Sequence, residues 1–424
     1  MVKYLISFSL HNRWIVLLVC LCMFLWGLYA VKKNPIDAIP DLSENQVIVF
    51  TEWVGRSPQL IEDQVTYPLV SNLQNIPNIK NVRGTSMFGM SFVYIVFEDN
   101  VDIYWARTRV LEKLSYAQRL LPEGITPALG PDGTGVGHVF WYTLHAPGYD
   151  LGELRALQDW YIKYGLQTVK GVSEVASFGG MQKQYQINID PHKLTYYNVS
   201  LTDVLKSVKS NNNDVSGRKF EMNDMGYIVR GLGYIKKIED VENIPVGKDG
   251  TTPIRIKDVA SVQMGGDLRL GIFDENGEGE VVGGIVVMRY KENADEVIRR
   301  VKSKLAAIEK GLPEGVQFKI AYDRSELIEA AISSVKRTLI EEIIVVSLIV
   351  ILFLFHWRSA FIIIIQIPVS IAASFILLNA FGISSNIMSI TGIALAIGVV
   401  VDDGIIMVEN AYRHIADAQQ KNEL

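Results

Sequence analysis

The stretch Thr391-Gly-Ile-Ala-Leu-Ala-Ile-Gly-Val-Val-Val-Asp-Asp-Gly-Ile-Ile-Met-Val-Glu-Asn410 holds two adjacent aspartates inside an apolar run. The run from about 387 to 408 is long enough to cross a bilayer, because about 20 helical residues span the hydrocarbon. A charged aspartate in the middle of such a span costs about 3 kcal/mol on insertion scales. Low dielectric favours the protonated form of a carboxyl group. We therefore expect a membrane protein that uses at least one of these acids to take up and release a proton.

Asp402 and Asp403 point to different faces of the predicted helix. At about 100° per residue, Asp402 shares a stripe with Gly398 and with Glu409. The small residues of the span would let another helix approach closely; they are Gly392, Ala394, Ala396 and Gly398. The hypothesis is that Asp402 is a proton-relay carboxylate facing a partner helix, with Asp403 and Glu409 as further candidates. The alternative is that the acids lie near the cytoplasmic end and reach water, and this alternative is favoured for Asp403.

Three other apolar runs have the length of a transmembrane helix, at 14–31, 339–355 and 361–378. None of them offers a Lys or an acid as a partner for Asp402, because Glu341 and Glu342 lie at the opposite membrane face. If the four spans alternate, the basic residues of the short segments gather on one side; they are Lys3, Arg13, Arg358, Arg413 and Lys421. This pattern predicts an amphipathic cytoplasmic segment at 1–13, a cytoplasmic tail at 409–424 and an exported segment from Lys32 to about Thr338.

Composition excludes several other classes of protein. The chain is 49% hydrophobic with a net charge of −5, which argues against disorder and against nucleic-acid binding through a basic surface. Cys20 and Cys22 lie about 200° apart on the first span, so they form neither a disulfide framework nor a shared ligand pair. The sequence has no P-loop motif and no paired histidines, so we expect no bound cofactor and no ATP-driven step.

The exported segment repeats itself at a separation of 93 residues. Eight positions match: Leu73, Gln74, Ile76, Ile79, Val82, Phe92, Tyr94 and Val96 correspond to Leu166, Gln167, Val169, Val172, Val175, Tyr185, Ile187 and Ile189. Each unit is predicted to run strand–helix–strand–strand–helix, which indicates ferredoxin-like βαβ subdomains at 32–135 and 136–338. A polar, glycine-containing stretch at about 218–252 interrupts the second unit. A helix starting near Asp323 is expected to continue without a break into the span at 339–355.

Several motifs together resemble the N-terminal portion of a heavy-metal efflux pump. They are Asn34-Pro-Ile-Asp-Ala-Ile-Pro-Asp-Leu-Ser43, Tyr104-Trp-Ala-Arg107, Leu129-Gly-Pro-Asp-Gly-Thr-Gly-Val-Gly137, Asn276-Gly-Glu-Gly-Glu280, Val401-Asp402 and Glu409-Asn410. The chain is similar to the resistance–nodulation–cell-division (RND) transporters of the CusA/CzcA type, and closest to the copper/silver pumps. The resemblance implies a polytopic α-helical membrane protein with a large α+β exported domain. Four helices of the twelve-helix RND architecture would be present, so we expect an N-terminal fragment.

The resemblance also implies a mechanism and partners. It predicts a proton/metal antiporter rather than an enzyme, forming a homotrimer in the bacterial inner membrane with its large domain in the periplasm. A periplasmic adaptor (membrane fusion protein) and an outer-membrane channel would complete a tripartite pump. The two subdomains would be porter subdomains, and 218–252 a docking-type insertion. Asp402 matches the proton-relay aspartate of the family, whereas Asp403 stands where copper pumps commonly have a small residue.

Met388 and Met407 stand at positions that resemble the methionine relay of the copper/silver pumps. Thioether ligands select Cu(I) and Ag(I), so these ions are favoured as transported cations over Zn(II), Co(II) and Cd(II). Val400 and Leu268 replace further methionines of that relay. Ordinary packing is the alternative for both methionines. At the level of the whole chain the alternatives are an inactive truncated membrane protein or scaffold, and an RND pump for organic drugs.

Overall fold

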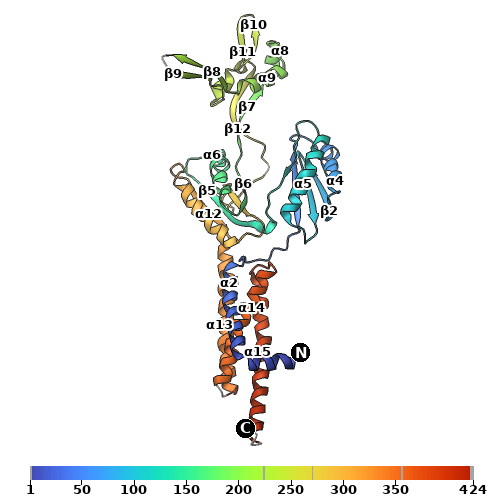
Figure 1. Cartoon of the computed structure of the whole chain (residues 1–424). Coiled ribbons are helices and arrows are strands. Elements are labelled where there is room, and N and C mark those ends of the chain that lie inside the picture. Colours follow the sequence, from blue (N-terminus) through green and yellow to red (C-terminus); the bar gives the residue numbers. More distant parts are fainter. Residues whose placement is uncertain (1, 223–224, 270, 355–356, 421–424) are drawn as a thin grey trace.

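A computed structural model of the chain describes residues 2–222, 225–269, 271–354 and 357–420. Long helices form the lower part of the molecule, two α+β units lie above them, and a small β-rich unit lies farthest from the helices (Figure 1). The long helices are α2 (Arg13–Lys33), α13 (Arg324–Leu354), α14 (Trp357–Ala380) and α15 (Ile387–Gln420). A short helix, α1 (Val2–His11), precedes α2.

Two of the described helices are long and apolar enough to cross a membrane. They comprise Arg13–Lys33 and Ile387–Ile415, and a shorter apolar helix covers Ile364–Ala380. The expected span at 361–378 falls within α14. The span at 339–355 coincides with the end of α13 as far as Leu354, and residue 355 lies outside the described part. The count of four spans therefore stays a prediction. The expected tail at 409–424 continues α15 as far as Gln420.

The first α+β unit is a four-stranded sheet covered by helices on one face. Its strands are β1 (Gln46–Glu52), β2 (Ile79–Met87), β3 (Met90–Phe97) and β4 (Ala128–Leu129), in the order β2-β3-β1-β4. Its helices are α3 (Pro58–Ile61), the π-helix η1 (Glu62–Thr66), α4 (Tyr67–Leu73), α5 (Ile103–Ala117) and the 3-10 turn η2 (Gln118–Leu120). Alternate strand residues such as Val49, Val93 and Ile95 are fully buried and form the core with α4 and α5.

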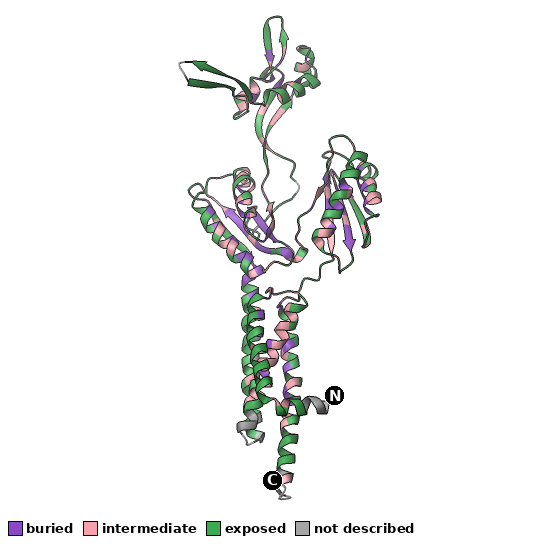
Figure 2. Ribbon diagram, viewed as in Figure 1, coloured by how far each residue is buried: buried purple, intermediate pink, exposed green. Residues whose placement is uncertain are grey.

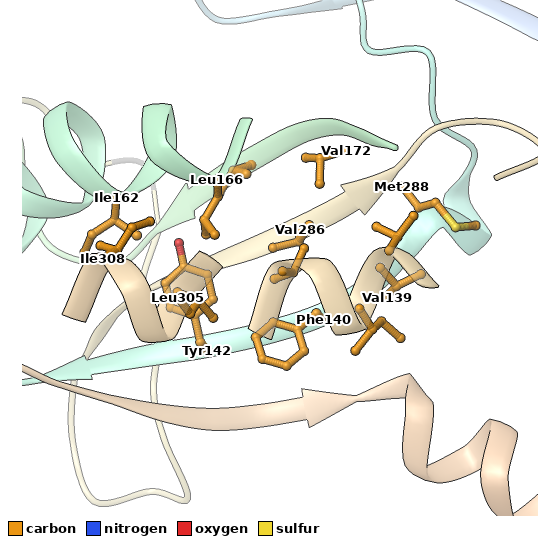
Figure 3. Close-up of a cluster of buried hydrophobic side chains, with 14 of the residues drawn as sticks. Val139, Phe140, Tyr142, Ile162, Leu166, Val172, Val286, Met288, Leu305 and Ile308 are labelled. Atoms are coloured by element: carbon orange, nitrogen blue, oxygen red, sulfur yellow. The ribbon is translucent and has the colours of Figure 1, made fainter. Parts of the chain in front are cut away.

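The second α+β unit has the same plan. Its strands are β5 (His138–His145), β6 (Val172–Phe178), β13 (Val282–Met288) and β14 (Gln317–Asp323), in the order β14-β5-β13-β6. Its helices are α6 (Leu151–Leu157), the π-helix η4 (Gln158–Ile162), α7 (Lys163–Gln167) and α12 (Ala294–Glu309). Tyr142, Leu166 and Val286 are among the side chains of its core (Figure 3). Matching strand order and a matching π-helix in each unit support a duplication.

The predicted repeat is confirmed as far as β2 and β6 and is wrong beyond them. We expected 185–189 to correspond to β3. Instead β7 (Lys183–Ile189) leaves the sheet and pairs with β12 (Ala260–Gly266), and β13 takes the position next to β5. Both candidate strands carry apolar residues, and local sequence does not reveal which one a distant strand selects.

The interruption of the second unit is longer than the stretch 218–252. Elements from β7 to β12 surround a separate core that includes Val204, Val241 and Ile256. The remaining elements are α8 (Pro191–Tyr196), α9 (Leu201–Asn211), β8 (Val215–Met222), β9 (Met225–Gly231), α10 (Ile238–Glu242), β10 (Pro245–Asp249), β11 (Thr252–Arg255) and α11 (Ile256–Val259). Every residue of β9 is exposed, and the β8–β9 hairpin projects from this unit (Figure 2).

Local end signals of the helices agree with the structure. Ser57 accepts a hydrogen bond from the Leu60 backbone N–H, and Asp150 and Glu153 form a capping box. The expected continuous helix is confirmed as α13, whose 31 residues extend about 46 Å. Since α13 follows β14 without a loop, the second α+β unit is joined directly to the long helices.

Candidate functional site

The packed face of α15 is apolar and repeats every four residues. Ile393, Ile397 and Val401 are buried and form a cluster with Ile367 of α14. One turn farther along, Gly404 allows close approach: a Cβ at this position would lie 2.8 Å from Oε1 of Gln366. Gln366 Nε2 also donates to the Val400 carbonyl at 3.4 Å. These contacts fix which side of α15 faces the other long helices.

The Asp402 stripe lies on the uncovered side of α15. Thr391, Leu395, Gly398, Asp402 and Glu409 are all exposed, as their shared helical face predicts. A Cβ at Gly392 or Gly398 would meet nothing within 4 Å. Among the described residues, the expected partner helix is therefore not found, and close packing of α15 occurs at Gly404 instead of at Gly392 and Gly398. The face is a continuous surface on which a carboxylate stands in an otherwise apolar stretch.

The other candidate residues of α15 are spread along the helix. Asp403 is exposed on a different side from the packed face. Glu409 forms an i,i+4 ion pair with Arg413, at 2.9 Å from Oε1 to Nη2. The exposed fractions of Met388 and Met407 are 66% and 63%. The two methionines are 19 residues apart on α15, which corresponds to about 28 Å along the helix axis, so they do not form one site.

One close contact between the long helices was not predicted from the sequence. A Cβ at Gly27 of α2 would lie 2.4 Å from Cβ of Ala372 on α14, and 2.5 Å from the Ala372 carbonyl oxygen. Gly27 itself indicated a contact, because a glycine inside an apolar span commonly marks the place where another helix packs closely. Its partner could not be read from the sequence, because any span could have approached it.

A clasp connects the start of the exported segment to the loop before α15. The Asn34 side chain is buried and donates to the Ile383 carbonyl at 3.1 Å and to Ser385 Oγ at 2.8 Å. Backbone bonds extend this contact: Ser385 N–H donates to the Pro35 carbonyl, and Asp37 N–H donates to the Ser385 carbonyl. Segments about 350 positions apart in the chain are thereby held together, which the sequence analysis did not foresee.

Arg324 ties the clasp to the first residue of α13. Its Nη1 lies 3.3 Å from Oδ2 of Asp37, and its Nη2 donates to the His138 carbonyl at 3.5 Å. Burial raises the pKa of Asp37, and the neighbouring Arg324 only partly offsets this effect. Burial also opposes the charge on Asp323, but hydrogen bonds from Lys302 and Ser325 outweigh it and lower the pKa of Asp323. The start of α13, the clasp and the second α+β unit therefore share one network of charged groups.

The loop that returns from the inserted unit is fastened to the second sheet by Glu275. Its carboxylate accepts a hydrogen bond from Thr143 Oγ1 at 2.9 Å and lies 2.5 Å from Lys319 Nζ. His145 Nε2 lies 2.9 Å from the same group. The hydrogen bond from Lys319 is the main reason that the pKa of Glu275 falls to about 2. Glu275 lies immediately before the Asn276–Glu280 motif that carried part of the resemblance.

The clasp and the Arg324 network connect the loop before α15 to the start of α13. Among the described residues, no group of three or more His, Cys, Asp or Glu side chains could hold a metal ion. A cavity of about 410 Å³ lies between the clasp and the second unit, lined by residues that include Asp37, Thr134, Tyr290 and Asn386. A shift of α15 would act on the clasp, and through Arg324 on α13 and β14.

The chain is similar to proteins that are named as cation efflux systems. The sequence model of the AcrB/AcrD/AcrF family matches residues 5–424 of the chain. The cation efflux system protein CusA of Escherichia coli (strain K12) is 44% identical over all of this chain and 41% of its own length. The putative cation efflux system protein SilA of Salmonella typhimurium is 44% identical over 98% of this chain and 40% of its own length.

The chain is also similar to a metal-resistance protein and to a solved structure of an efflux pump. The cobalt-zinc-cadmium resistance protein CzcA of Cupriavidus metallidurans is 37% identical over 99% of this chain. A crystal structure of a heavy metal efflux pump superposes with a TM-score of 0.85 at 33% identity, covering 97% of this chain and 41% of that one. The chain thus spans about 40% of the length of the curated relatives it matches.

Proposed function

Because this chain belongs to the AcrB/AcrD/AcrF family, and within it to the heavy-metal RND pumps, we propose that it is part of a proton-driven exporter of metal cations. The observation that carries the proposal is the placement of Asp402. It stands on the uncovered face of an apolar helix whose opposite face is packed. Transporters of this family are not classical enzymes, and the proposed cycle makes and breaks no covalent bond in the cargo.

Asp402 is the proposed proton carrier. Protonation removes a charge from an apolar surrounding and deprotonation restores it, so the two states of α15 differ in the surroundings they prefer. The clasp at Asn34 and the pair of Arg324 with Asp37 would carry the resulting shift to α13. The α+β units, acting as porter subdomains, would then open and close. Helices beyond the described residues would cover the Asp402 face in the complete pump.

Cu(I) and Ag(I) are the proposed cargo, ahead of Zn(II), Co(II) and Cd(II). The identity to CusA and SilA exceeds the identity to the cobalt-zinc-cadmium protein, at 44% against 37%. Met388 and Met407 supply soft thioether groups on α15, and such groups favour monovalent copper and silver. Since the two side chains lie far apart, each would contact the ion at a different stage of transport.

The proposed assembly is a homotrimer in the inner membrane, joined to a periplasmic adaptor and an outer-membrane channel. The inserted unit supports an assembly role because its β8–β9 hairpin exposes apolar side chains. Ile228 is 76% exposed, and Phe220 and Val229 are close to half exposed. A two-stranded hairpin with such side chains gains stability when another surface covers it.

The decisive experiment replaces Asp402 in the full-length protein that contains this chain. In a metal-sensitive host, Asp402→Asn should reduce copper and silver resistance to the level of an empty vector, because an amide carries no proton through the cycle. Asp417→Asn, on the exposed end of the same helix, is the matched control and should retain resistance. Undiminished resistance of the Asp402→Asn protein would refute the relay.

Metal and drug susceptibility measured in the same strains separate the two kinds of cargo. Protection against copper and silver alone supports the proposed cargo. Protection against organic drugs alone would replace it with the drug-pump alternative.

A further inference from the structure

The tip of the β2–β3 hairpin brings two methionines together. Met87 and Met90 flank the two-residue turn Phe88–Gly89 and are directly paired across the two strands. Directly opposite residues of an antiparallel pair have Cβ atoms about 5 Å apart and point to the same face. Two thioether side chains can therefore reach the same small ion, which residue spacing alone did not reveal.

A carboxylate continues this row on the next strand. Glu52, the last residue of β1, pairs directly with Met90 on the side opposite Met87. The strand order β2-β3-β1 therefore aligns Met87, Met90 and Glu52 across one end of the sheet. We call these three residues the Met–Glu row. Among the described residues, the side chain of Glu52 has no hydrogen-bond or ion-pair partner, so its carboxylate is available to an ion.

The row lies on the face of the sheet that carries no helices. Ser91, Val93 and Ile95 of β3 are buried under the helices, so Met90 points to the other face by strand alternation. Met87 is 52% exposed, and Glu52 is exposed as well. An ion can therefore reach the row directly from solvent.

The backbone around the row is held in place. Gly89 adopts a positive φ of 73°, which suits the turn, and its carbonyl accepts from the Trp53 N–H at 2.8 Å. The Gly89 N–H donates to the Arg56 carbonyl at 2.9 Å. Trp53 in turn packs against the core of the first unit. Ligands on such a braced turn need little ordering when an ion binds.

We propose that Met87, Met90 and Glu52 form a surface binding site for a soft monovalent cation, Cu(I) or Ag(I), on the exported domain. The two thioether sulfurs select the soft ion, and the carboxylate neutralises its charge. The site would collect the ion at the first α+β unit before the pump moves it. This inference rests on the proposed function for its choice of cargo, whereas the geometry of the row is independent of transport.

A second methionine pair in the molecule provides an internal comparison. Met222 and Met225 are paired at the end of the β8–β9 hairpin. That sheet has only these two strands in the described part of the chain, so no carboxylate stands beside the pair as Glu52 does. We expect tighter binding at the Met–Glu row than at this pair.

The test is Ag(I) binding to the purified full chain in detergent, measured by equilibrium dialysis with metal analysis. The double variant Met87→Leu/Met90→Leu should lose one bound equivalent of Ag(I), while Zn(II) binding stays unchanged. Leucine conserves side-chain volume, so the fold should persist, which circular dichroism checks. Glu52→Gln should keep the equivalent but weaken it by about tenfold.

Two controls make the outcome specific. Met264→Leu removes a methionine that is 45% exposed and pairs with Tyr185 instead of a second thioether, and it should bind as the wild type does. Met222→Leu/Met225→Leu should leave the tightest equivalent intact. Wild-type Ag(I) binding in Met87→Leu/Met90→Leu, or loss of the tightest equivalent only in Met222→Leu/Met225→Leu, would overturn the site.

The binding test and the transport test fail independently. Dialysis needs no proton gradient, so Asp402→Asn should bind Ag(I) as the wild type does. If Met87→Leu/Met90→Leu keeps the equivalent while Asp402→Asn abolishes resistance, only the surface site is wrong. If the equivalent is lost as expected but Asp402→Asn still protects cells, the site stands and the proposed relay is wrong.

Discussion

Asp402 and Val401 are neighbours on α15 but lie in opposite surroundings. Val401 is 4% exposed in the contact with α14, whereas Asp402 lies on the open stripe. A rotation of about 100° between adjacent residues is enough to separate the two environments. One helix can thus be anchored by an apolar face while it presents a carboxylate on another face.

The contribution of the Glu275 carboxylate to folding stability should depend on pH. Its folded-state pKa of about 2 lies below its ordinary value of 4.5, so its stabilising contribution is complete above about 4.5 and is lost as the pH falls toward 2. Glu275→Gln should cost about 2 kcal/mol of stability at neutral pH, because the charge-assisted bonds from Lys319 and Thr143 are weakened. Urea unfolding of the full chain, monitored by tryptophan fluorescence, measures this difference.

The same unfolding measurement at low pH checks that prediction. The gap between wild type and Glu275→Gln should shrink steadily at about pH 4 and about pH 3, since the wild-type carboxylate becomes protonated there. Asp99→Asn breaks an exposed pair with Lys80 and should leave the stability close to that of the wild type, because exposed ion pairs contribute little. A gap that stays constant down to the lowest pH would contradict the role of the Glu275 charge.

At the scale of elements, α2 and α14 are fixed by one glycine. Any side chain at Gly27 would overlap the backbone of Ala372, which cannot move without shifting α14. Gly27→Ala should therefore cost about 1–3 kcal/mol by overpacking. Gly392→Ala, where the added methyl group meets nothing within 4 Å, should be tolerated.

Thermal unfolding in detergent compares the two glycine variants. The contact is correctly described if Gly27→Ala lowers the midpoint and Gly392→Ala does not. Equal midpoints for the two proteins would mean that α2 and α14 are not packed through Gly27.

At the scale of the whole molecule, α13 connects the second α+β unit directly to the other long helices, and in the proposed function it transmits movement between them. Ser333 lies on an exposed part of this helix. Ser333→Pro removes a backbone hydrogen bond and costs about 3 kcal/mol locally, which kinks or breaks the helix. In the full-length pump, this variant should lose metal resistance while it still binds Ag(I) at the Met–Glu row, which lies in the other unit.

Ser333→Ala is the matched control and should preserve both resistance and binding. Resistance in the proline variant at the wild-type level would show that the two parts of the molecule communicate by another route. Membrane insertion of each variant, followed by protein level, ensures that a loss of resistance reflects coupling.

The sequence alone determined the local features of the fold. These are the helix caps, the β2–β3 hairpin, the unbroken α13 and the shared stripe of Asp402, Gly398 and Glu409. Each depends on residues a few positions apart, whose geometry is set by helical or strand periodicity. The tertiary structure alone decided the contacts between distant segments. These are the choice of β13 over β7, the Gly27–Ala372 contact, the Asn34 clasp and the alignment of Met87, Met90 and Glu52. They join segments far apart in the chain, and several segments of similar pattern could compete for each partner. Packing of the complete cores selects among them, because only one pairing buries all the apolar faces at once.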